Sequence, residues 1–194
     1  MTLRRCVMAI EEGYAAASDY VNAIPFLRIE SAFNKLQDFF NLAADYFLAE
    51  KCKQGIIPLQ ASFPLNVSNN YRHLELTSDG IVITLSSIRK PGEFPRYALF
   101  REQHASEQTS LYEDAKPDSS LYAILVHQRT QNKDERFSPK VQIGIPNTEY
   151  SYWEELFSLD GIPSISMSNA EIADDLESTI TLKKNLGDIF AQGL

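Results

Sequence analysis

The chain has 194 residues, of which 44% are apolar and 23% are charged. This composition excludes a disordered protein and predicts a single folded domain over residues 1–194. The net charge of −8 has the wrong sign for a protein that neutralises nucleic-acid phosphates across a broad face. No run approaches the roughly 20 apolar residues of a membrane span, and Cys6 and Cys52 lack the paired spacing of a disulfide or zinc framework. We therefore expect a soluble cytoplasmic protein.

The first part of the chain, residues 1–55, predicts a helical layer. Residues 6–21 have the apolar spacing of a short amphipathic helix. A longer helix is expected from Pro25 to Lys53, because proline is favoured at the first position of a helix. Apolar residues recur there at steps of four and three and form one stripe: Ile29, Phe33, Leu36, Phe40, Ala43 and Phe47.

Residues 56–165 predict a mainly antiparallel sheet of five or six strands. Polar and apolar residues alternate over 73–77, a turn follows at 78–80, and 81–88 complete a hairpin. Further strands are expected at 97–101, 121–126 and 141–145. The second of these is apolar enough to be covered on both faces.

Two later segments leave alternatives open. The polar connection over 102–120 is long for a compact domain, so it is mobile, partly helical or functional. The aromatic group over 150–157 fits either a helix or a strand.

The last segment, 166–194, predicts an acidic C-terminal helix and tail. Ser168 and Glu171 have the spacing of a capping box at its start. Residues 146–194 hold 9 acidic and 2 basic side chains, a net charge of −7 out of −8. Four carboxylates face either solvent or a basic protein partner: Glu171, Asp174, Asp175 and Glu177.

The chain lacks the common motifs of catalysis and of cofactor binding. Neither G-x-S-x-G nor a glycine-rich phosphate loop occurs. His73 and Glu75 point to one face of a strand, but two ligands alone do not close a metal site. We therefore assign no catalytic residue, no metal site and no cofactor. The sequence leaves open whether His73, His104 and His127 converge.

Basic residues cluster in two loops, 89–101 and 129–140. If these loops lie at one end of the sheet, they form a positive face with Phe94 and Tyr97 available for stacking. Alternatively, Glu93, Asp134 and Glu135 neutralise that face. The candidate nucleic-acid ligands are Arg89, Lys90, Arg96, Arg101, Arg129, Lys133, Arg136 and Lys140.

Residues 121–159 resemble uncharacterised proteins of bacteria and their phages. The shared pattern is an apolar strand, a charged loop, the run Val-Gln-Ile-Gly-Ile-Pro at 141–146, and Tyr152 with Trp153. The resemblance implies a microbial intracellular setting and transfers no catalytic residue.

We therefore predict an α+β fold with N-terminal helices packed on the sheet and a helix at the C-terminus. The leading hypothesis is a non-catalytic interaction protein, similar to an antitoxin, immunity protein or inhibitor, that binds a basic protein partner. The alternative is a nucleic-acid-binding or nuclease-type protein that uses the basic loops. A third hypothesis is a structural subunit that forms a homo-oligomer through its aromatic segment.

Overall fold

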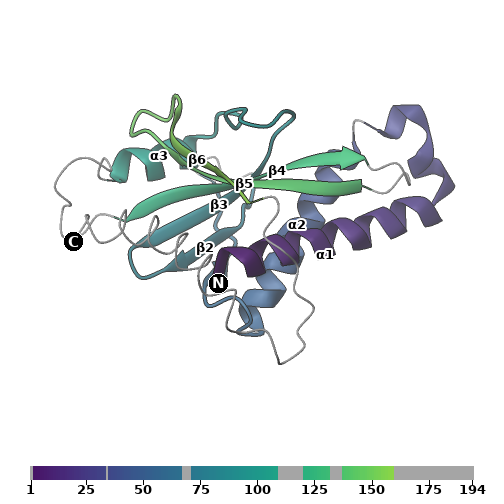
Figure 1. Ribbon diagram of the computed structural model, residues 1–194, viewed down its shortest axis with the longest axis horizontal. Helices are drawn as coiled ribbons and strands as arrows, with labels where there is room; N and C mark the ends of the chain where they lie inside the picture. The colour runs from purple at the N-terminus through teal and green to yellow at the C-terminus, as the bar shows by residue number, and fades with distance from the viewer. Residues whose placement is uncertain (1, 34, 67–70, 109–119, 132–136, 160–194) are drawn as a thin grey trace, which may run out of the picture.

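The computed structural model describes residues 2–33, 35–66, 71–108, 120–131 and 137–159. Helices pack on a six-stranded sheet in an α+β fold, which confirms the predicted fold class (Figure 1). The expected C-terminal helix over 166–194 lies outside the described residues. Among the described helices, none combines the length and apolar character needed to cross a bilayer.

Two long helices pack against each other on one side of the sheet: α1, Thr2–Ala23, and α2, Leu36–Lys53. Gly13 lies at their contact, where an added Cβ would be 2.9 Å from the carbonyl oxygen of Ala43. The glycine that interrupts the amphipathic pattern therefore lets the two helices approach closely. Next to it, the rings of Tyr14 and Phe40 lie 4.8 Å apart.

The prediction of a single helix over Pro25–Lys53 is wrong. Two 3₁₀ turns, Pro25–Arg28 and Glu30–Ala32, precede α2. Between them Ile29 is extended, with φ −74° and ψ 149°, and this conformation interrupts a helix. Ile29 and Phe33 thus belong to a connection, and both are about half exposed.

The sheet has the strand order β1-β2-β3-β4-β5-β6. All neighbouring strands are antiparallel except β3 and β4, which run parallel. The predicted hairpin over 73–88 is confirmed as β2 and β3. The strands are β1 Gln60–Ser62, β2 Glu75–Ser78, β3 Ile81–Ser87, β4 Leu121–Gln131, β5 Phe137–Pro146 and β6 Trp153–Ser158. The aromatic group at 150–157 therefore contributes to a strand rather than a helix.

The parallel pair requires a crossover connection, and this connection contains the helix α3, Leu99–Glu107. The prediction of a strand at 97–101 is therefore wrong. Its short apolar run fits either structure, and the crossover decides in favour of a helix. Of the alternatives for the 102–120 connection, the partly helical one is confirmed over 102–107.

Each face of the sheet has its own core. Side chains alternate along β4, so Ala123 and Leu125 pack toward α1 and α2, whereas Ile124 and Val126 face the other way. Ala105 of α3 joins this second core. The helices thus cover opposite faces of the sheet, with β4 buried between them.

Candidate metal centre

Three side chains from different parts of the chain meet on the α3 face of the sheet. His73 lies two residues before β2, Glu75 begins β2, and His104 lies on α3. Leu74 and Leu76 belong to the core beneath α1 and α2. Strand alternation therefore turns His73 and Glu75 toward α3, where the crossover supplies His104.

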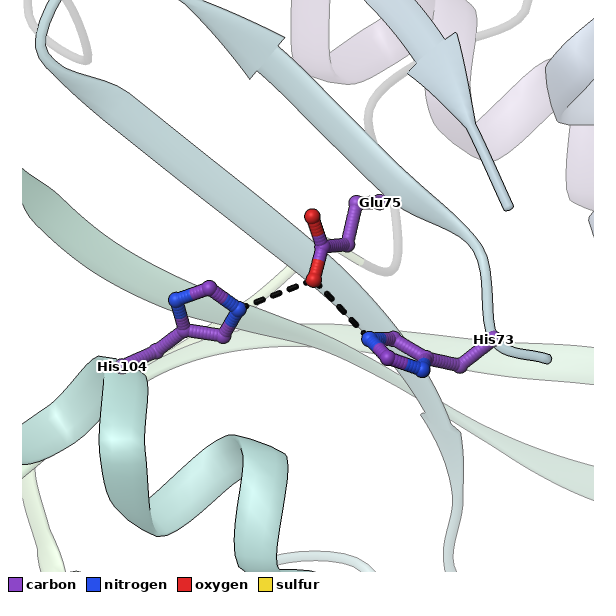
Figure 2. Close-up of side chains that lie close together, drawn as sticks. All are labelled: His73, Glu75 and His104. Carbon is purple, nitrogen blue, oxygen red and sulfur yellow. Dashed lines mark hydrogen bonds and ion pairs between the residues drawn. The ribbon is translucent and has the colours of Figure 1, made fainter. Parts of the chain in front are cut away.

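The two imidazoles contact the same carboxylate oxygen (Figure 2). The Nε2 atoms of His73 and His104 each lie 2.9 Å from Oε1 of Glu75. One potential ligand atom from each residue thus falls within 4.8 Å of the other two. In the chain as it stands, each Nε2–H donates a hydrogen bond to the carboxylate.

The site is half-buried, with a closed and an open side. The side chain of His73 is 6% exposed, whereas those of Glu75 and His104 are 16% and 23% exposed. Solvent therefore reaches the cluster from the side of Glu75 and His104.

Burial and hydrogen bonding set the protonation states of the cluster. Burial lowers the pKa of His73, although Glu75 opposes this shift by accepting its hydrogen bond. Burial by itself raises the pKa of Glu75, but hydrogen bonds from His104 and His73 bring that pKa below its ordinary value. At neutral pH the cluster therefore holds a neutral His73 beside an ionised Glu75, the states in which these groups ligate metals.

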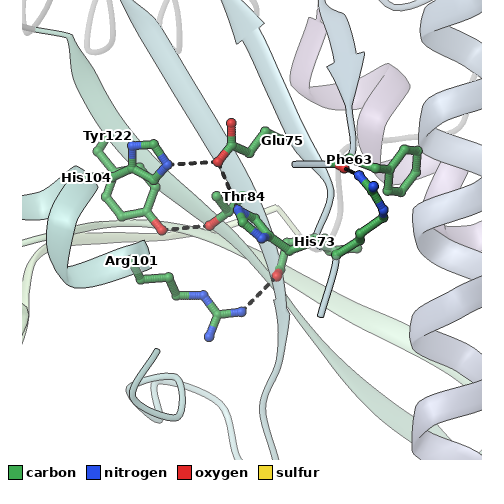
Figure 3. A network of polar contacts seen from close by, with 9 residues as sticks. Phe63, His73, Glu75, Thr84, Arg101, His104 and Tyr122 are labelled. Atoms are coloured by element: carbon green, nitrogen blue, oxygen red, sulfur yellow. Dashed lines mark hydrogen bonds and ion pairs between the residues drawn. The ribbon is translucent and has the colours of Figure 1, made fainter. Parts of the chain in front are cut away.

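Aromatic rings from α3 and from the sheet pack against the two imidazoles, and Figure 3 shows Tyr122 of the sheet beside His104. The ring of Phe100 stacks on His73 with centroids 3.6 Å apart. The ring of Tyr122 lies 5.1 Å from that of His104. The hydroxyl of Tyr122 is in turn bonded to that of Thr84 at 2.7 Å, on the strand that pairs with β2.

These residues fit a divalent transition metal. Imidazole nitrogen and carboxylate oxygen are the usual non-thiolate ligands of Zn²⁺, and a set of two histidines and one glutamate occurs in hydrolytic zinc sites. Ligand atoms at tetrahedral zinc distances lie about 3.3 Å apart. The two 2.9 Å contacts therefore need to open by about 0.4 Å to admit an ion, and the two imidazole nitrogens, which lie within 4.8 Å of each other, need to reach the same spacing.

The third histidine lies apart from this cluster. His127 is fully buried on the opposite face of β4, where its Nδ1 lies 2.8 Å from the hydroxyl of Tyr14. Two of the three histidines converge. The sequence signal for the pair was the i, i+2 spacing of His73 and Glu75, but nothing in the sequence placed His104 beside them.

Two members of the predicted basic patch make contacts within the fold. Arg129 packs over the rings of Phe33 and Phe137 and donates to the carbonyl of Phe33. Arg101 donates to the carbonyls of Arg96 and Leu85.

The other basic candidates divide into exposed and undescribed residues. Glu93 accepts hydrogen bonds from the backbone N–H groups of Arg89 and Lys90, so a carboxylate does lie beside these cations. Four of the candidates have exposed side chains: Arg89, Lys90, Arg96 and Lys140. Lys133 and Arg136 lie outside the described residues.

The predicted partner-binding carboxylates also lie outside the described residues. These are Glu171, Asp174, Asp175 and Glu177, so the acidic surface stays a prediction from the sequence. No family model, curated protein or solved structure matches the chain. The resemblance over 121–159 likewise stays a prediction.

Proposed function

We propose that this protein binds a divalent transition metal ion, Zn²⁺ in the first instance, through His73, Glu75 and His104. The observation that carries the proposal is the convergence of two Nε2 atoms on one carboxylate oxygen. Glu75 is already ionised and needs no proton change before it ligates, whereas Nε2 of His73 must give up the proton that it donates to Glu75.

Three protein ligands would leave a fourth position of a tetrahedral ion open to water. This arrangement distinguishes catalytic zinc sites from structural ones, which are closed by four protein ligands. Zinc lowers the pKa of bound water to about 7 and so generates hydroxide at neutral pH. The open side at Glu75 and His104 supports a hydrolytic role over a structural one.

Titration of the metal-free full-length chain with Zn²⁺ tests the proposal. Isothermal calorimetry should give one site per chain, and Co²⁺ should give the visible absorption of a tetrahedral ion. His104→Ala and Glu75→Gln should each weaken binding by at least about tenfold. Glu107→Gln is the matched control, because Glu107 is an exposed carboxylate one turn further along α3. Equal affinities in the wild type and both ligand variants would overturn the assignment.

We also propose a second function, the binding of a basic protein in the cytoplasm through the acidic C-terminal segment. The support is the net charge of −7 over residues 146–194. Reversing the charges of Glu171, Asp174, Asp175 and Glu177 should slow association with such a partner and reduce its salt dependence. An unchanged, salt-sensitive association rate would rule out this segment.

A further inference from the structure

We infer that the pocket beside α3 binds a small ligand that combines a planar aromatic ring with an anionic group, as a mononucleotide does. The pocket has a volume of about 360 Å³, within the range of small-molecule sites. Its main lining residues are Asn66, Tyr71, Tyr97, Leu99, Phe100 and Arg101. None of the three proposed metal ligands lines it, so this inference does not rest on metal binding.

Exposed aromatic rings provide the surface for the planar group. Tyr71 and Tyr97 come from separate loops, and their side chains are 57% and 67% exposed. The hydroxyl of Tyr97 donates a 2.5 Å hydrogen bond to Glu102, which restrains the ring at the pocket. Restrained aromatic faces exposed to water are the surfaces on which nucleobases and similar rings stack.

Arg101 provides the charge for the anionic group. Its Nη1 and Nη2 atoms donate to the carbonyls of Arg96 and Leu85, each at 3.1 Å. Neither acceptor is a carboxylate, so these bonds orient the guanidinium without neutralising it. An oriented guanidinium that no carboxylate neutralises suits phosphate or carboxylate.

Two neighbouring features change the charge at this pocket in opposite directions. The first turn of α3 lines the pocket and Ala98 offers no side-chain cap, so the positive end of the helix dipole adds to Arg101. Asp45 opposes Arg101, but burial raises the pKa of Asp45 to about 7, so this carboxyl is only partly ionised at neutral pH. Arg101 and the helix end thus supply positive charge at the pocket, and the Glu102 carboxylate bonded to Tyr97 supplies negative charge.

Calorimetric titration of the full-length protein in the presence of a chelator tests the pocket alone. The probes are adenosine monophosphate, adenosine and inorganic phosphate. Adenosine monophosphate should bind at least about tenfold more tightly than either fragment, because stacking and charge act together. Phenyl phosphate and benzoate then distinguish a phosphate ligand from a carboxylate ligand. Binding of adenosine monophosphate no tighter than that of inorganic phosphate would overturn the inference.

Two substitutions test whether adenosine monophosphate binds at this pocket rather than elsewhere on the protein. Tyr97→Ala should weaken the binding of adenosine monophosphate by about tenfold, because a stacking ring is lost. The side chain of Tyr97 is exposed, so we expect the substitution to leave folding unchanged. Tyr152→Ala is the matched control, since Tyr152 is 58% exposed and does not line the pocket. Equal losses in both variants, or no loss in Tyr97→Ala, would reject the site. Zinc binding is measured separately without nucleotide, so failure of one proposal leaves the other standing.

Discussion

The ring of Phe100 lies flat against the imidazole of His73, with centroids 3.6 Å and planes 18° apart. The contact joins α3 to the segment that leads into β2, on the buried side of the candidate metal centre. Phe100→Leu keeps the position apolar but removes the flat face that orients His73. Aromatic pairing of this kind contributes about 0.5–1.5 kcal/mol.

We expect Phe100→Leu to weaken zinc binding by about three- to tenfold, in proportion to that lost contact. Calorimetric titration measures the effect. Phe137→Leu is the control, because Phe137 packs against Phe40 on the face covered by α1 and α2, away from the cluster. Equal zinc affinities in Phe100→Leu and the wild type would show that stacking does not position His73.

Acid should destabilise the protein partly through His127. Burial lowers the pKa of this histidine to about 4 from the ordinary value of 6.5. Between these pH values the unfolded chain binds a proton that the folded chain does not, so stability falls as the pH drops from 6.5 toward 4. The contribution is on the order of 3 kcal/mol and is fully present above pH 6.5.

Urea unfolding at several pH values checks this expectation. His127→Gln keeps a polar partner for Tyr14 and removes the titrating group. The variant should lose less stability than the wild type over this pH range. Parallel pH profiles for the two proteins would assign the acid sensitivity to other groups.

Gly144 on β5 should not tolerate a side chain. A Cβ at this position would overlap the indole ring of Trp153 on the neighbouring strand. Gly144→Ala should therefore lower the free energy of unfolding by about 1–3 kcal/mol, the usual cost of overpacking. In a Trp153→Leu background the same substitution should cost less, since the clashing ring is gone. Additive effects in this double-mutant cycle would contradict the proposed overlap.

We expect Arg129 to stabilise the fold rather than to contact phosphate. Its guanidinium carbon lies 4.4 Å from the ring centroid of Phe33 and 5.1 Å from that of Phe137. Arg129→Lys keeps the charge but loses the planar group that stacks and donates to Phe33. We expect a loss of about 2 kcal/mol in thermal or urea unfolding.

The exposed Arg89 serves as the control for this substitution. Arg89→Lys should change stability by less than about 0.5 kcal/mol. A stable Arg129→Lys variant with weakened nucleic-acid binding would instead favour the sequence-based hypothesis for this residue.

Local periodicity was enough to predict much of the fold. Alternation over 73–77 and the turn at 78–80 identified the hairpin, and the apolar run at 121–126 identified the strand covered on both faces. These signals succeed because the side-chain period of a strand repeats within a few residues. The prediction of one helix over Pro25–Lys53 was wrong, because the spacing of apolar residues carries no information about the extended backbone at Ile29.

The candidate site was only half visible in the sequence. Spacing placed His73 and Glu75 on one face, but it could not supply a third ligand 29 residues beyond Glu75. The parallel pairing of β3 and β4 forces the intervening chain to cross the sheet, and α3 carries His104 across that face.

The sequence by itself determined the α+β class, the hairpin and the buried central strand, because each follows from the period of neighbouring residues. Only the tertiary structure decided that Arg101 and Arg129 donate to distant backbone carbonyls and that His73 and His104 share one carboxylate. These contacts join segments far apart in the chain, and long-range strand pairing rather than local preference brings them together.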